Sequence, residues 1–134
     1  MSANRFRLAL RTALAQAVIT DAGATGAKLK LYNGSVPAAV GSATGTLLAS
    51  GSWPSGPIGV ASNGTIDLDE TGFSQTSSGF TAGTPTYADI CKSDDTVVHR
   101  VELNVTDGWT FTGAVVVSQN LTLTTLSVTM PGAT

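Results

Sequence analysis

Short runs in which apolar and polar residues alternate fill most of this chain, and turn sequences separate them. A period of two places successive side chains on opposite faces of a strand, so that one face can be buried. Two such runs, residues 27–32 and 65–69, adjoin Asn-Gly pairs at 33–34 and 63–64. Asn-Gly is a strong signal for a tight turn. The pattern predicts an antiparallel β protein rather than one built from βαβ units.

The second half of the chain carries the clearest strand pattern. Residues 86–92 and 96–105 flank an Asp-Asp turn, and further runs follow at 109–118 and 121–130. With the earlier runs, these make about seven or eight short strands separated by turns. We therefore predict a mainly β fold, an antiparallel β-sandwich or jelly roll.

Two local features of these strands are also predicted. In the run of residues 96–105, the alternation places Val97, His99 and Val101 on the core face. The segment from Ser52 to Gly59 holds Trp53 and two prolines, Pro54 and Pro57, which favour loops and sheet edges. We expect a loop or an edge there.

One helix is predicted, from Asn4 to about residue 22, because Asn4 is a favourable N-cap and Gly23 a natural stop. The apolar residues at helical spacing are Phe6, Leu10, Ala13, Leu14, Ala17 and Val18. We expect one domain over residues 1–134, with an N-terminal helix or arm over 1–23 and the β-sandwich over 26–131. No secretory signal is expected, because Arg11 interrupts the apolar run.

Charge is scarce and unevenly placed. Only 12% of residues are charged, against about 25% in an average soluble domain. Such a surface suits a protein covered by a partner, although a hydroxyl-rich surface is also well hydrated. Residues 1–30 hold five basic residues and one acidic residue, whereas the rest is acidic. Either the helix binds something acidic or it covers its own sheet with its arginines in water. The candidate partner-binding residues are Arg5, Phe6, Arg7 and Arg11.

Residues for catalysis or metal binding are few. The chain has one cysteine, Cys91, and one histidine, His99, so no intrachain disulfide or zinc site is expected. The two could meet across a hairpin, but a buried, inert thiol is the expectation. Asp67 and Asp69 share a strand face, where solvated carboxylates are expected rather than a hydrolase pair. We predict no enzymatic activity, no cofactor and no metal.

Five segments of the N-terminal half carry a family resemblance: residues 1–7, 22–34, 37–38, 46–49 and 61–64. They resemble a group of small β-rich virion structural proteins of tailed bacteriophages. This resemblance implies a place in the virion. By analogy of size and fold with cement proteins, we expect a capsid decoration protein on the capsid surface, made in the host cytoplasm. Its partners would be the major capsid protein and copies of itself, as a homotrimer.

Alternative functions remain open at this stage. A tail, collar or baseplate component fits the same resemblance. A carbohydrate-binding module is a different class, with Trp53, Trp109, Tyr32 and Tyr87 as candidate stacking residues. Nucleic acid is not expected as a partner, because three arginines with few interleaved aromatics are a weak signature. No membrane partner is expected, because no apolar run approaches the length of a span.

Overall fold

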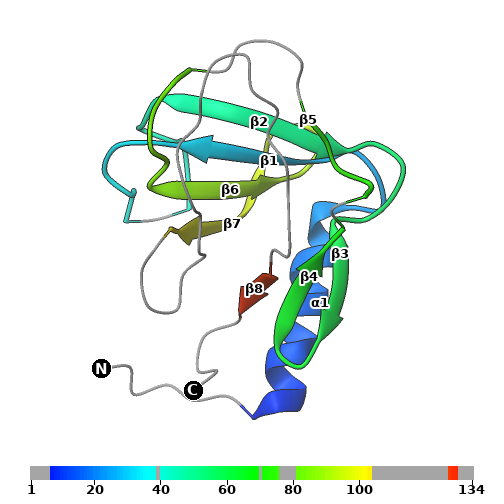
Figure 1. The fold of residues 1–134 in the computed structure, drawn as a ribbon. Helices are drawn as coiled ribbons and strands as arrows, with labels where there is room; N and C mark the ends of the chain where they lie inside the picture. Colours follow the sequence, from blue (N-terminus) through cyan, green and yellow to red (C-terminus); the bar gives the residue numbers. More distant parts are fainter. Residues whose placement is uncertain (1–6, 39, 70, 76–80, 104–126, 130–134) are drawn as a thin grey trace.

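The protein is mainly β, as the sequence predicts. The computed structural model describes residues 7–38, 40–69, 71–75, 81–103 and 127–129. The predicted strand at 109–118 lies outside these residues, as does most of the one at 121–130. The elements, shown in Figure 1, are α1 (Leu8–Ala22), β1 (Ala27–Tyr32), β2 (Leu47–Trp53), β3 (Gly59–Ser62), β4 (Thr65–Leu68), β5 (Ser74–Gln75), β6 (Tyr87–Cys91), β7 (Val97–Glu102) and β8 (Ser127–Thr129).

Five of these strands form one antiparallel sheet, in the order β5-β2-β1-β6-β7. The β3–β4 hairpin is separate from it, and β8 pairs with β4. Figure 1 shows the hairpin lying along α1, below the large sheet. The described residues thus form a five-stranded antiparallel sheet, a smaller sheet that contains the β3–β4 hairpin, and one helix. They show neither a sandwich nor a jelly roll.

Alternation in β1 creates the core face of the large sheet. Ala27, Leu29 and Leu31 are buried, whereas the residues between them are partly exposed. Trp53 faces the same side, since it pairs with Ala27, and it is fully buried. The Trp53 indole N–H donates to the Asp69 carbonyl oxygen at 2.8 Å. The expected loop is present at residues 54–58, but it begins later than predicted, because β2 continues to Trp53 and ends in the core.

The predicted turn at Asn63-Gly64 is confirmed. Asn63 and Gly64 have φ of 50° and 76°, and Ser62 pairs with Thr65 on either side. Two consecutive positive φ values are the requirement of a type I′ turn, and Asn-Gly meets it with little strain. This turn fixes the register of the hairpin against which α1 packs.

The helix starts later than predicted, and its buried face overlaps the predicted stripe only in part, because Leu14 and Val18 of that stripe pack against the core. Its first residue is Leu8, with Arg7 rather than Asn4 as the N-cap. The buried side chains are Ala15, Ile19 and Ala22, whereas Leu10, Ala13 and Ala17 of the predicted stripe are exposed. Apolar residues occur around most of the helix circumference, so their spacing alone does not identify the buried face.

A bulge in β7 also changes one predicted face. Ile90 pairs with His99 while Cys91 pairs with Val97, so β7 has one extra residue here. Val98 consequently packs against the core. Val97 lines a cavity on the other side of the sheet, together with Cys91. The prediction that Val97 faces the core is therefore wrong.

Across the part of the chain that the structure describes, no helix has the length and apolar character needed to cross a membrane.

Candidate functional site

The exposed side of α1 is uncharged over most of its length. It consists of Ala9, Leu10, Ala13, Gln16, Ala17 and Thr20, all exposed, and is called the outer face below. Leu10 is 41% exposed, and Leu8 at the start of the helix is 47% exposed. Burying such a surface against a partner requires little desolvation of polar groups. The outer face is therefore suited to protein–protein contact.

Two of the four predicted partner-binding residues, Arg7 and Arg11, are among the residues that the structure describes. Arg5 and Phe6 lie outside the described residues. Arg7 is exposed at the N-cap. Arg11 is half-buried and packs against Gly64, where a side chain would come within 3.0 Å of its guanidinium. Arg11 thus contributes to the packing of the helix against the β3–β4 hairpin.

A hydrogen bond at Thr12 also stabilises the contact between α1 and the β3–β4 hairpin. The backbone N–H of Gly64 donates to Thr12 Oγ1 at 2.9 Å, and Thr12 Oγ1 donates to the Leu8 carbonyl at 3.1 Å. The side of α1 that carries Thr12 and Ile19 therefore packs against the hairpin, and the outer face points away from the hairpin.

The two lysines among the first 30 residues share one carboxylate partner within the fold. The ammonium groups of Lys28 and Lys30 lie 2.9 and 2.8 Å from the same oxygen, Oδ1 of Asp95. Lys92 pairs with Asp21 near the end of α1 at 3.3 Å. Part of the basic excess of residues 1–30 is thus held by β1 against an acidic turn.

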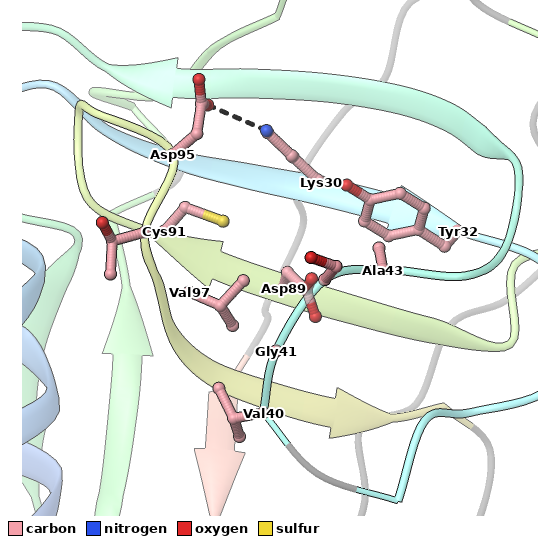
Figure 2. A pocket seen from close by; sticks show the side chains of 11 residues that line it. Lys30, Tyr32, Val40, Gly41, Ala43, Asp89, Cys91, Asp95 and Val97 are labelled. Carbon is pink, nitrogen blue, oxygen red and sulfur yellow. Dashed lines mark ion pairs between the residues drawn. The ribbon is translucent and has the colours of Figure 1, made fainter.

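A cavity of about 330 Å³ lies on the polar side of the large sheet. Its floor is β1 and β6, and the loop of residues 40–43 covers it (Figure 2). We call it the loop cavity. The lining residues are Lys30, Tyr32, Val40, Gly41, Ser42, Ala43, Asp89, Cys91, Asp95, Thr96 and Val97.

A buried ion pair connects the covering loop to the sheet. Arg100 Nε and Nη2 each donate to an Asp89 carboxylate oxygen at 2.7 Å, and Nη2 also donates to the Gly41 carbonyl at 2.9 Å. The side chains of Arg100 and Asp89 are 4% and 1% exposed. The hydrogen bond to Asp89 raises the pKa of Arg100 above its usual range.

Two stacked aromatic rings lie next to this ion pair. The Arg100 guanidinium lies 5.3 Å from the centre of the Tyr87 ring, and Tyr87 stacks on Tyr32 at 5.1 Å. Tyr87 and Trp53 are fully buried, and Trp109 lies outside the described residues. Among the described aromatic residues, the candidates for sugar stacking therefore do not assemble into an exposed platform.

The candidate catalytic groups are the Cys91–His99 pair and the two carboxylates of β4 and the turn after it, and none of them is arranged for catalysis. Cys91 and His99 lie on opposite faces of the sheet, since His99 pairs with Ile90. Burial raises the pKa of the Cys91 thiol to about 11 and lowers the pKa of His99. Asp67 is exposed, and Asp69 Oδ1 accepts from the Gly72 N–H at 3.0 Å, closing a turn. In the described ranges, no group of His, Cys, Asp and Glu side chains is arranged to hold a metal ion.

Asp89, Asp95 and Arg100 are not among the site residues predicted from the sequence. The sequence does carry a signal for Asp89, which interrupts the otherwise apolar run Tyr87–Cys91, and all five residues of this strand are buried in the structure. A buried carboxylate requires a charged partner. The predicted hairpin places the following strand beside β6, and the register aligns Arg100 with Asp89.

Comparison with known proteins does not assign a family. No family model, no curated protein and no solved structure matches this chain.

Proposed function

We propose that this chain is a structural protein of a tailed-bacteriophage virion, most simply a capsid decoration protein that binds the major capsid protein. The observation that carries the proposal is the uncharged, exposed outer face of α1, with Leu10 41% exposed on a helix already anchored on its other side. Rigid presentation of an apolar surface lowers the ordering cost of binding.

Other properties of the chain agree with a role in assembly. Its charged fraction of 12% limits the polar surface that must be desolvated at an interface. The resemblance of the N-terminal half to phage structural proteins includes residues 22–34, which contain the end of α1 and all of β1. A homotrimer and a jelly-roll or sandwich body are finer parts of the same proposal.

The first test is the presence of the chain in purified particles. We expect quantitative mass spectrometry to find it in hundreds of copies, on the order expected for a shell with many equivalent sites. About a dozen copies or fewer would instead favour the tail, collar or baseplate. Absence from the particles would refute a virion role.

The second test targets the outer face of α1. Particles assembled without the chain are mixed with the purified protein and sedimented. Leu10→Glu should weaken co-sedimentation at least tenfold, about 1.4 kcal/mol, because it buries a charge in the contact. Leu47→Glu is a matched control, since Leu47 is 38% exposed but lies at the start of β2. Equal binding by the two variants would exclude the outer face as the contact.

A further inference from the structure

We propose that Asn33 is a site of spontaneous deamidation in the folded protein, whereas Asn63, which stands in the same Asn-Gly sequence, is protected by the packing of α1. This inference does not depend on the proposed virion role. It rests on the different hydrogen bonds that the fold gives to the two Asn-Gly pairs.

The reaction needs only an asparagine, the backbone amide that follows it and water. The backbone nitrogen loses its proton to solvent base and forms a bond with Cγ, the carbonyl carbon of the asparagine side chain. The bond between Cγ and Nδ2 breaks, ammonia leaves, and a succinimide ring remains. Water then opens the ring at either carbonyl and gives aspartate or isoaspartate. Glycine favours the first step, because it has no side chain to hinder the approach of its nitrogen.

At Asn63 the fold restrains the attacking nitrogen. The Gly64 N–H donates to Thr12 Oγ1 at 2.9 Å, and Gly64 is buried beside the Arg11 side chain. The proton that must leave is therefore held by a hydroxyl of α1 and shielded from solvent base. Asn63 itself is exposed, so exposure of the asparagine does not decide the rate. The reaction there requires the contact between α1 and the hairpin to open first.

At Asn33 the attacking nitrogen is open to solvent. Gly34 is exposed, with a φ of 92°. Within the part of the chain that the structure describes, its N–H forms no hydrogen bond. Asn33 also lies just beyond the end of β1, outside the strand ladder. Solvent base can therefore remove the Gly34 proton without any opening of the fold.

The side-chain carbonyl of Asn33 is polarised by a fixed donor. The Thr46 N–H donates to Asn33 Oδ1 at 3.1 Å, and the Asn33 N–H donates to the Thr46 carbonyl at 3.1 Å. Pairing of Tyr32 with Leu47 holds the two residues opposite each other. Negative charge develops on Oδ1 as the nitrogen attacks Cγ, and a fixed N–H at that oxygen stabilises it, as in an oxyanion hole. The fold thus assists the reaction at Asn33 and hinders it at Asn63.

Deamidation at Asn33 alters the connection between β1 and β2. Asn33 and Thr46 close the base of this connection, and Arg100 holds the Gly41 carbonyl farther along it. Isoaspartate routes the main chain through the former side chain, so the Thr46 N–H loses its side-chain acceptor. Either product also adds one negative charge, which takes the formal net charge from −2 to −3.

The test compares the two asparagines within the same molecule. The full chain is incubated at mildly alkaline pH, in buffer and in concentrated urea, and is then digested with pepsin in acid, where further deamidation is slow. Tandem mass spectrometry gives the deamidated fraction at each asparagine. In urea the two should react at similar rates, because the fold no longer distinguishes them. In buffer Asn33 should react at least about tenfold faster than Asn63. A rate at Asn63 equal to or above that at Asn33 in buffer overturns the proposal.

Variants of α1 test the cause of the protection at Asn63. Thr12→Val removes the hydroxyl that accepts from Gly64 and should raise the rate at Asn63 in buffer about fivefold, whereas Thr12→Ser keeps the hydroxyl and should react as the wild type does. Thr20→Val is the matched control, since Thr20 is exposed on the outer face and its hydroxyl accepts from Gln16. An unchanged rate at Asn63 in Thr12→Val, in a sample that circular dichroism shows to be folded, contradicts protection by Thr12.

The structural consequence is measured on the deamidated protein, which anion exchange separates by its additional charge. The amide hydrogen of Thr46 should exchange with solvent about fivefold faster in the isoaspartate product than in the unmodified chain, because its acceptor is lost. Equal exchange in the two forms would show that the Asn33 side chain does not close the connection between β1 and β2.

Discussion

Arg100 and Asp89 form a two-pronged ion pair between neighbouring strands, with both N–O distances at 2.7 Å. Both side chains are almost completely buried, and the same guanidinium holds the Gly41 carbonyl and lies over the Tyr87 ring. One arginine thus joins β7, β6 and the loop that covers the cavity. A buried pair of this kind makes the sheet sensitive to the loss of either partner.

Replacing only the arginine should destabilise the protein strongly. Arg100→Met leaves the Asp89 carboxylate buried without its partner, and we expect a loss of about 3–5 kcal/mol in the free energy of unfolding. Urea denaturation measures this change. Replacing both residues, with Asp89→Leu and Arg100→Met together, should be less destabilising than Arg100→Met alone, because no buried charge remains unpaired.

An exposed pair provides the control for that experiment. Lys28 and Asp95 lie 2.9 Å apart, but their side chains are 34% and 53% exposed. Lys28→Met should therefore change the free energy of unfolding by less than about 1 kcal/mol. A loss in Lys28→Met equal to that in Arg100→Met would show that burial is not the cause.

The strands and turns followed from local patterns. The alternation in residues 27–32 marked β1, and Asn63-Gly64 marked the β3–β4 turn, because each pattern depends only on neighbouring residues. The buried position of Trp53 depended on the pairing of Trp53 with Ala27, which no local pattern encodes. The prolines after Trp53 led to the prediction of a loop that begins before Trp53.

The candidate sites were harder to predict for a related reason. The loop cavity requires residues 40–43, Lys30 and Asp95 to meet, and these come from three separate segments. The helix was predictable but its exposed face was not, since Leu10 and Ile19 are both apolar and only the contact with the hairpin distinguishes them. The bulge at Val98 likewise arises from pairing with β6 rather than from the sequence of β7 alone.

Gly59 should tolerate no side chain. An added Cβ would overlap the Asp67 carbonyl of the paired strand, which is backbone and cannot rotate away. Gly59→Ala should destabilise the protein by about 1–3 kcal/mol in urea denaturation. Gly56 is the matched control, since a Cβ there meets no atom within 4 Å, and Gly56→Ala should change stability by less than about 1 kcal/mol. Similar values for the two variants would contradict the close approach at Gly59.

The Cys91 thiol should be nearly unreactive in the folded protein. Its pKa is raised from 9.0 to about 11, so at pH 8 it has about 100-fold less thiolate than an unperturbed thiol. The side chain is also 1% exposed. Reaction with a disulfide reagent should therefore be at least about 100-fold slower in the native protein than in denaturant. Equal rates, in a sample that circular dichroism shows to be folded, would contradict the burial.

Stability should fall as the pH drops below about 6.5, because of His99. Burial lowers the pKa of His99 in the folded state below its ordinary value of 6.5. Between these two pKa values the unfolded chain binds more protons than the folded one, so the free energy of unfolding decreases with falling pH. His99→Leu removes this dependence.

The carboxyl groups of Asp94 and Asp95 act in the same direction, but only near and below pH 3.8. Their pKa values are lowered by hydrogen bonds to Thr96 and Lys30 respectively. Urea denaturation at a series of pH values separates the two ranges, and an identical slope near pH 6 in the wild type and His99→Leu would rule out His99 as the source.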